Sequence, residues 1–202
     1  MLLPRGYLSH SAITCFKTNK ARFVKEYLEG GKKLHTKYMD LGKTIAKMIE
    51  QDKHHDILPG LPVYELREHE IRVEIAGVPI LCYLDDCKAD YSSFRDKKSG
   101  LKPWSQTKAQ KSEQLLLYAT AIRAKYGVTP KTAYIDWLET TMSEEECTGG
   151  LCRDPQVLLT GRYESYERRF DIRELDRMEK EIAKVAVEIE KFYGNWLDNQ
   201  LN

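Results

Sequence analysis

Hydrophobic and polar residues follow one another along this chain with two different periods. Apolar residues spaced three or four positions apart predict helices, and apolar residues spaced two apart predict strands with one buried face. The first pattern predicts helices from Ser9 or Ser11 to about residue 29, then at 33–51, 105–126 and 172–197. The second predicts strands at 63–67, 70–75, 80–86, 94–100, 131–139, 156–160 and 163–170.

Two polar segments interrupt these elements. Residues 52–62 hold several helix-breaking residues and predict a loop, on which the adjacent His54 and His55 are expected to be exposed rather than ligands. Residues 140–155 predict a loop or the tip of a hairpin.

The composition predicts a single domain over residues 1–202. Hydrophobic residues make up 42% of the chain and charged residues 31%, and the net charge is +1, so any attraction to nucleic acid must be local. We find no apolar run that could span a bilayer and no signal peptide, and we therefore expect a cytoplasmic protein. The five cysteines are an odd number and are expected to be reduced thiols.

Two short apolar runs, one ending at Asp85 and one at Asp96, carry the candidate chemistry. Alternate residues of a strand share a face, so Asp96 and Lys98 point the same way and Lys97 the opposite way. If the two runs are neighbouring strands, Asp85 lies beside that pair. Two carboxylates can hold Mg²⁺ or Mn²⁺, which activates a water that the ammonium orients. Asp86 is an alternative to Asp85 and Lys97 an alternative to Lys98, although strand alternation favours Asp85 and Lys98.

Three blocks of the sequence resemble the PD-(D/E)XK nuclease superfamily, and within it the RecB-like and Cas4-like nucleases. GVPILCYLD (77–85), RDKKSG (95–100) and QLLLY (114–118) are similar to the family's "G-x-P-h-x-G-x-h-D" strand, "D-x-K-[TS]-G" strand and "Q-x-x-x-Y" helix, in the same order. The resemblance implies an α+β (α/β) fold with a restriction-endonuclease-like core. A central mixed β-sheet would be flanked by helices, with an N-terminal helical pair and a long C-terminal helix.

The resemblance also implies roles for these residues. Asp85 and Asp96 would bind one or two Mg²⁺ or Mn²⁺ ions, and the backbone carbonyl of Lys97 would complete the shell. Lys98 would position the attacking water, and Gln114 would steady Lys98 or a phosphate.

The chain departs from the family at Ala46, where relatives often carry a metal-binding histidine. The missing ligand could come from an acid, and the sequence does not choose among Glu50, Glu65, Glu68, Glu70 and Glu74. Some Cas4-like relatives hold an iron–sulfur cluster with a late group of three cysteines. Only Cys147 and Cys152 stand there, so no iron–sulfur cluster is expected.

Positive charge gathers around the candidate site. Between residues 88 and 111 there are seven lysines and arginines against two aspartates. A phosphate backbone would be drawn there, with binding that weakens in salt. The candidates for contacting nucleic acid are Tyr118, Lys97, Lys102, Trp104 and Lys108. Trp104 could stack on a base or fill the core, and Tyr118 could equally be a core-edge aromatic.

These features predict a metal-dependent DNA nuclease, specifically a RecB- or Cas4-like exonuclease acting on single strands or duplex ends, with no membrane partner. The alternative is a catalytically weak or inactive nucleic-acid-binding protein on a nuclease scaffold, which Ala46 motivates. A third reading is an interaction protein, because the apolar stripe of the last helix could dock a protein partner or a second copy.

Overall fold

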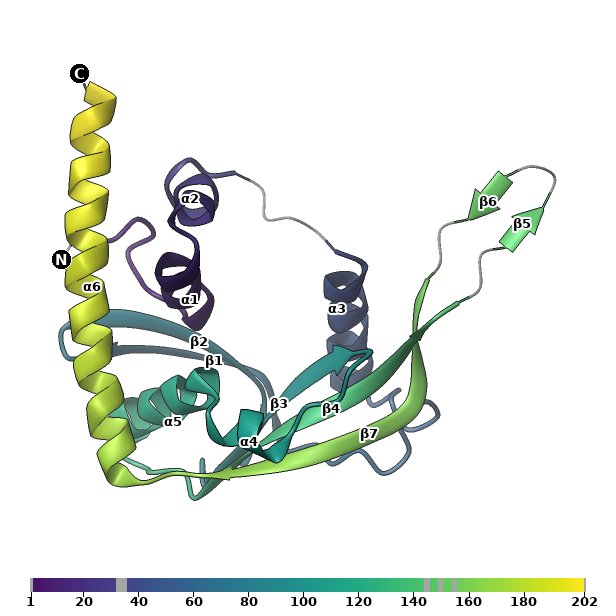
Figure 1. Cartoon of the computed structure of the whole chain (residues 1–202). Coiled ribbons are helices and arrows are strands. Elements are labelled where there is room, and N and C mark those ends of the chain that lie inside the picture. Colours follow the sequence, from purple (N-terminus) through teal and green to yellow (C-terminus); the bar gives the residue numbers. More distant parts are fainter. Residues whose placement is uncertain (1, 32–35, 144–145, 149–150, 154–155, 202) are drawn as a thin grey trace.

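The computed structural model describes residues 2–31, 36–143, 146–148, 151–153 and 156–201 (Figure 1). Its helical segments are α1 (His10–Thr18), α2 (Lys20–Phe23), the π-helix η1 (Val24–Leu28), α3 (Lys37–Glu50), α4 (Gln106–Gln110), α5 (Glu113–Tyr126) and α6 (Ile172–Leu201). Its strands are β1 (Leu66–Ile75), β2 (Val78–Cys87), β3 (Ser93–Gly100), β4 (Thr132–Met142), β5 (Glu146–Thr148), β6 (Leu151–Arg153) and β7 (Val157–Arg169).

Five strands form one sheet in the order β1-β2-β3-β4-β7. Strands β3 and β4 run parallel, and α4 and α5 make the crossover that a parallel pair requires. The other neighbours in this sheet are antiparallel. The predicted α+β fold, a central mixed sheet flanked by helices with a long C-terminal helix, is therefore confirmed (Figure 1).

Two groups of helices cover this sheet (Figure 1). Helix α5 packs on β1 and β2, and α6 packs on α5, around the larger hydrophobic core. Helix α3 contacts β3, β7 and β1, and with the loop that follows it forms a second, smaller core. The fully buried members of the smaller core are Ile45, Ile49, Leu58, Leu61 and Leu138.

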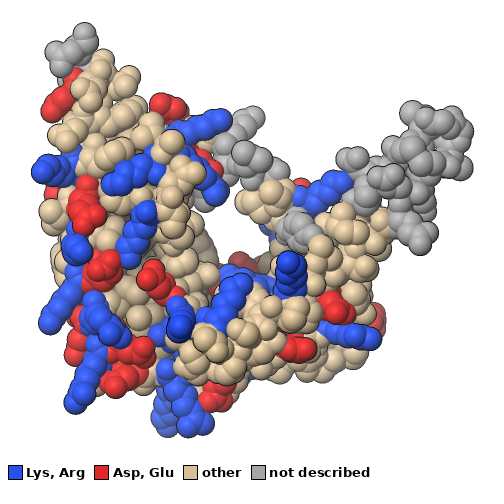
Figure 2. Space-filling model, in the orientation of Figure 1, with Lys and Arg blue, Asp and Glu red and all other residues tan. Residues whose placement is uncertain are grey.

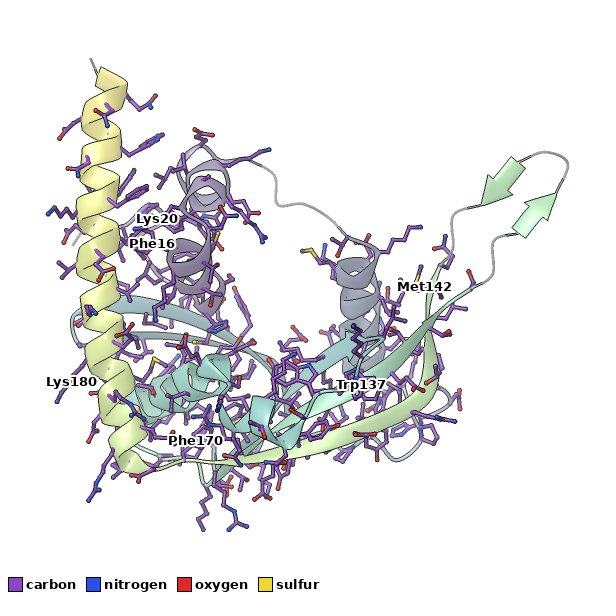
Figure 3. The ribbon with its side chains drawn as sticks, in the orientation of Figure 1. Phe16, Lys20, Trp137, Met142, Phe170 and Lys180 are labelled. Carbon is purple, nitrogen blue, oxygen red and sulfur yellow. The ribbon has the colours of Figure 1, made fainter. Side chains whose placement is uncertain are left out.

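The N-terminal helices are held against α6 by aromatic contacts. The ring centroids of Phe16 and Phe192 are 5.6 Å apart, and Lys20 Nζ lies 3.9 Å from the centre of the Phe16 ring (Figure 3). The continuous first helix that the sequence predicts is broken at Asn19, whose side chain accepts a hydrogen bond from Arg22 N and so caps α2. No helix in the described ranges is both long and apolar enough to cross a bilayer.

The predicted helix 105–126 is also divided, into α4 and α5, because Ser112 is the N-cap residue of α5. Ser112 Oγ accepts a hydrogen bond from Leu115 N at 3.3 Å, and this competes with continuation of α4. Strand β7 holds the break in place: Arg168 Nη1 donates to the carbonyl of Ser112, and Gln110 Nε2 donates to the carbonyl of Glu167 at 3.1 Å.

Two pairs of predicted strands are each one strand in the structure. Segments 63–67 and 70–75 correspond to β1, which begins at Leu66, and segments 156–160 and 163–170 correspond to β7. Gly161 lies at φ +87° inside β7, so the chain bends there without ending the strand. In the polar insert, β5 and β6 pair as a two-stranded hairpin, and the side chains of Cys147 and Cys152 lie outside the described residues.

A buried ion pair joins β3, β4 and β7 across one face of the sheet. Arg95 Nε and Nη2 each donate to the carboxylate of Asp136 at 2.7 Å, and Ser165 Oγ donates to the same carboxylate at 2.6 Å. The exposed fractions of the Arg95 and Asp136 side chains are 6% and 0%. Because both charges are removed from water, each depends on the other for its stabilisation.

We predict that Arg95→Met lowers the free energy of unfolding by about 3–5 kcal/mol, since it leaves the Asp136 carboxylate buried without its cation. The double variant Arg95→Met/Asp136→Leu should recover most of that loss, because no uncompensated charge remains. Urea denaturation of the three proteins measures both effects. A double variant that is as unstable as Arg95→Met would contradict this account.

Candidate active site

The site depends on the early separation of β2 and β3. These strands pair through only two residue pairs, Asp86 with Arg95 and Cys87 with Phe94. Asp85 and Asp96 would form the next pair along. Instead, the carboxylate of Asp85 accepts the hydrogen bond of Lys97 N–H at 2.5 Å, in place of a backbone carbonyl of β2. The two aspartates that the sequence singled out therefore stand at the point where the strands part.

Asp96 is the centre of a network of side chains from β3 and α5. Its Oδ2 lies 2.7 Å from Lys98 Nζ, and its Oδ1 accepts a hydrogen bond from Gln114 Nε2 at 3.0 Å. Gln114 also donates to the hydroxyl of Tyr118 at 2.8 Å. The structure thus brings Asp85, Asp96, Lys98 and Gln114 together. It places Tyr118 behind Gln114, with 8% of its surface exposed, where it supports the amide.

The electrostatics of the two aspartates favour a bound cation. Burial and the neighbouring charge of Asp96 raise the pKa of Asp85 to about 7, because two carboxylates this close do not readily ionise together. Burial lowers the pKa of Lys98, but the carboxylates of Asp96 and Asp85 together raise it above its ordinary value. Lys98 therefore stays protonated and offsets part of the negative charge.

One oxygen at this point fits a metal ion. Asp96 Oδ2 is buried, and the Lys98 ammonium lies 2.7 Å from it. A carboxylate oxygen in this position is a natural ligand for a hard divalent cation. The donor set around it, all oxygen with one ammonium nearby, fits Mg²⁺ or Mn²⁺ better than a softer metal.

A cavity of about 200 Å³ adjoins Asp85. Its lining residues are candidates for the metal ligand that Ala46 does not provide. Ala46 lines the cavity, as do Glu50 from α3 and Glu68 from β1. Glu68 lies directly opposite Asp85, between the paired residues on either side, and its φ of +45° is unusual for a residue other than glycine. Glu68 is exposed in part, and the partial burial of its carboxylate raises its pKa; Lys97 opposes this shift, and Glu50 adds to it.

Of the other acids that the sequence left open, Glu65 and Glu70 are engaged elsewhere. Glu65 Oε2 accepts a hydrogen bond from Ala89 N, and Glu70 pairs with Arg72 at 2.6 Å and accepts the Tyr83 hydroxyl at 2.7 Å. Glu74 is exposed near the end of β1. Among the five candidates, Glu50 and Glu68 are the ones that line the cavity beside Asp85.

Asp86 and Lys97, which the sequence offered as alternatives to Asp85 and Lys98, form an ion pair with each other. Lys97 Nζ donates to Asp86 Oδ2, and Tyr64 N donates to Asp86 Oδ1 at 3.1 Å. The Lys97 side chain is 7% exposed and that of Asp86 is 0% exposed. The structure therefore gives these residues a structural contact, and the Lys97 ammonium would have to leave Asp86 before it could reach a nucleic acid.

The remaining candidates for nucleic-acid contact lie just after β3. Lys102 and Lys108 are exposed, and Lys108 Nζ lies 4.0 Å from the centre of the Trp104 ring. Trp104 is partly buried against the larger core, and stacking on a base stays a prediction. Figure 2 shows this side of the molecule hollowed between the N-terminal helices and α3, with lysine and arginine side chains around the hollow.

Sequence reasoning did not identify His10 as a neighbour of the site. It lies at the start of α1, where burial lowers its pKa, Lys98 lowers it further and Asp96 opposes both. Its position depends on packing between α1 and α5, and a single histidine after the N-cap Ser9 carries no signal of that packing. Likewise, nothing in the local sequence distinguishes Glu68 from its neighbouring glutamates.

No protein-family model and no curated protein sequence matches the chain. Several solved structures match its fold over most of its length. In a crystal structure in complex with dAMP, LHK-Exo superposes with a TM-score of 0.55 and 13% identity, covering 98% of this chain and 94% of that one. A second structure, of LHK-Exo as an alkaline exonuclease from Laribacter hongkongensis, gives a TM-score of 0.50 and 16% identity, with coverages of 97% and 93%.

A phage-related exonuclease from Haemophilus somnus 129PT is similar as well, with a TM-score of 0.52 and 17% identity, covering 97% of this chain and 86% of that one. At these identities the likeness concerns the fold. The chain therefore has the α+β fold of these exonucleases, as the resemblance to PD-(D/E)XK nucleases implies. The likeness does not point specifically to the RecB-like or Cas4-like branch.

We predict that Asp85→Asn stabilises the metal-free protein, and more so at pH 8 than at pH 5. The pKa of Asp85 is about 7 in the folded chain, against about 3.9 for an unfolded aspartate. Its contribution to stability is therefore fully present below the unfolded value and is lost as the pH rises through 7. Asparagine has no such loss.

Urea denaturation in the presence of EDTA at both pH values measures the difference between Asp85→Asn and the parent protein. Asp56→Asn, at an exposed aspartate of the loop after α3, is the matched control and should show no such pH-dependent gain. A difference that is equal at pH 5 and pH 8 would show that the Asp85 carboxylate is not destabilised by its surroundings.

Proposed function

We propose that this chain is a metal-dependent DNA nuclease that hydrolyses phosphodiester bonds and acts as an exonuclease. The observation that carries the proposal is the convergence of Asp85, Asp96, Lys98 and Gln114 where β2 and β3 part. The exonuclease fold of the chain supports the same reading. We assign it to the RecB-like or Cas4-like kind on the three sequence blocks alone.

In this proposal Asp85 and Asp96, with the backbone carbonyl of Lys97, hold Mg²⁺ or Mn²⁺. The bound ion would polarise the phosphate and lower the pKa of a water molecule. Lys98, 2.7 Å from Asp96, orients that water and offsets the charge that develops on the phosphate oxygens. Gln114 holds the Asp96 carboxylate in one orientation, and Tyr118 fixes the Gln114 amide.

The surroundings of this centre fit a nucleic-acid strand, and the choice of DNA rests on the exonuclease fold. Lys102, Lys108 and Trp104 follow β3 directly, where the two lysines can pair with phosphates and the indole can stack on an unpaired base. The lysines and arginines around the hollow in Figure 2 extend the same attraction. Binding should therefore weaken steeply as the salt concentration rises.

A second candidate is a nucleic-acid-binding protein that does not cut, and Ala46 favours it because alanine offers no metal ligand. Glu50 and Glu68 line the same cavity as Ala46, and in this proposal either can take the place of the histidine. We therefore propose the active enzyme, with Glu68 as the further ligand because it faces Asp85 across the strand pair.

We predict cleavage of end-labelled linear DNA with Mg²⁺ or Mn²⁺ and a loss of about 10²–10⁴-fold in kcat for Asp96→Asn and for Lys98→Gln. Lys180→Gln, at an exposed lysine on α6 far from β3, is the matched control for Lys98→Gln and should cleave at the parent rate (Figure 3). Closed circular DNA should resist cleavage. Tight, salt-sensitive DNA binding without cleavage in either metal would instead identify the second candidate.

We predict that Glu68→Gln raises the Mg²⁺ concentration needed for half-maximal cleavage by about tenfold or more, because one ligand oxygen is lost. Glu70→Gln, two residues further along β1 and paired with Arg72, is the control and should leave the Mg²⁺ dependence unchanged. Titrating Mg²⁺ in the cleavage assay measures both. If Glu50→Gln shifts the titration and Glu68→Gln does not, the ligand is Glu50.

A further inference from the structure

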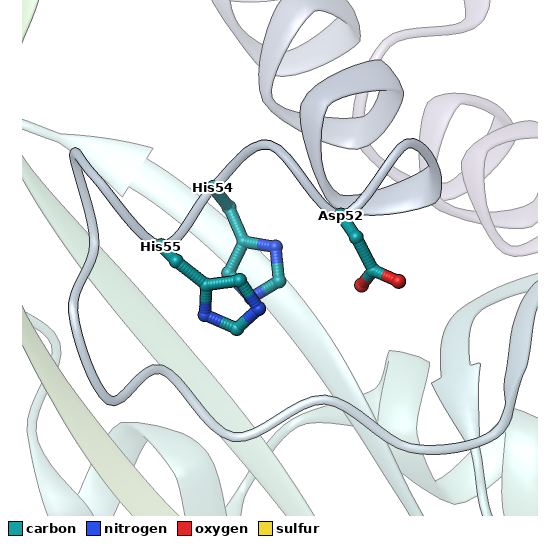
Figure 4. Close-up of side chains that lie close together, drawn as sticks. All are labelled: Asp52, His54 and His55. Carbon is teal, nitrogen blue, oxygen red and sulfur yellow. The ribbon is translucent and has the colours of Figure 1, made fainter.

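The loop between α3 and β1 gathers three potential metal ligands outside the site described above. Asp52, His54 and His55 each offer one ligand atom, and these atoms all lie within 4.8 Å of one another (Figure 4). The sequence predicts both histidines to be exposed. His55 is exposed, but the prediction is wrong for His54, which is 1% exposed because the loop folds back against the smaller core.

His54 is a buried polar side chain whose hydrogen-bonding groups are not used. Neither Nδ1 nor Nε2 has a hydrogen-bond partner among the described residues. Leaving such a group unpaired costs about 1–3 kcal/mol, so a buried imidazole of this kind calls for a partner.

Asp52 is held beside the histidines by a residue of β1. Arg67 Nη2 lies 2.8 Å from Asp52 Oδ1, and Arg67 Nη1 donates to the carbonyl of Ile49 at 2.8 Å, near the end of α3. Asp52 adopts φ +56°, a conformation that aspartate tolerates better than most residues. The Arg67 contact fixes the Asp52 carboxylate through one of its two oxygens.

We propose that Asp52, His54 and His55 bind one divalent transition-metal ion, of which Zn²⁺ is the natural choice. Two imidazole nitrogens and one carboxylate oxygen suit Zn²⁺ or Co²⁺, whereas Mg²⁺ prefers oxygen alone, so this site differs from the one at Asp85 and Asp96. Ligands about 2.0–2.1 Å from Zn²⁺ lie roughly 3.4 Å apart, so side-chain rotation must bring these atoms somewhat closer. Water would take the fourth position.

The position of this site gives it a structural role. It ties the end of α3 to the loop that packs Leu58 and Leu61 into the smaller core, and Arg67 links it to β1 one residue before Glu68. A bound ion would therefore brace the wall of the cavity next to Asp85 without touching the substrate.

The test uses the full-length Asp96→Asn protein, stripped with EDTA, so that the site at Asp85 is weakened. Calorimetric titration with Zn²⁺ and visible absorption with Co²⁺ should show one bound ion with the spectrum of a low-symmetry, near-tetrahedral site. His55→Ala and Asp52→Asn in that background should each weaken Zn²⁺ binding by on the order of 100-fold. Loss of a residue that only hydrogen-bonds to a ligand costs about 10- to 100-fold, and loss of a ligand should cost at least as much. Asp56→Asn is the matched control and should bind as tightly as the background.

Since His55 is exposed, His55→Ala removes a ligand without altering the core, and it decides the question even if a variant of buried His54 fails to fold. A rise in melting temperature with Zn²⁺ that disappears in His55→Ala would support the site. Unchanged Zn²⁺ affinity in His55→Ala and Asp52→Asn would overturn it. The measurement does not involve DNA, so its outcome is independent of whether the chain is a nuclease.

Discussion

The separation of β2 and β3 after two residue pairs is the constraint on which the candidate site depends. A sheet normally uses every backbone group of its inner strands, and here the carboxylate of Asp85 replaces the backbone partner of Lys97 N–H. That exchange frees the two strands to diverge without leaving the N–H group unpaired. It also brings the carboxylate of Asp85 to Asp96, so one hydrogen bond both ends the strand pairing and begins the site.

The buried charged residues on the two faces of the sheet differ in how they are paired. On one face Arg95 with Asp136, and Lys97 with Asp86, are ion pairs in which each cation has a carboxylate partner. On the other face Asp96 is the only carboxylate that contacts Lys98 among the described residues, and Asp85 adds a second negative charge with no cation of its own. The first arrangement stabilises the fold, and the second stores an unfavourable interaction that a divalent ion relieves.

Much of the fold followed from periodicity, and the strand alternation correctly separated Asp96 and Lys98 from Lys97. The pairing of Lys97 with Asp86 did not follow, because it depends on the register that sets Asp86 opposite Arg95, two residues before Lys97 on the same face, and the sequence does not give that register. The break at Ser112 was not apparent because residues 105–114 contain neither glycine nor proline, and the burial of His54 was not apparent because its loop is polar in sequence. Glu68 could not be chosen from four similar glutamates, since its left-handed backbone and its place opposite Asp85 exist only in the folded sheet.

The break between α4 and α5 connects β7, at the edge of the sheet, to the candidate site. Arg168 of β7 holds the carbonyl of Ser112, and two residues later Gln114 holds the Asp96 carboxylate. Displacement of the arginine would let the first turn of α5 fray, and the amide would lose its registration on the aspartate. A molecule that bound β7 and displaced Arg168 would therefore slow turnover without contacting the nucleic acid.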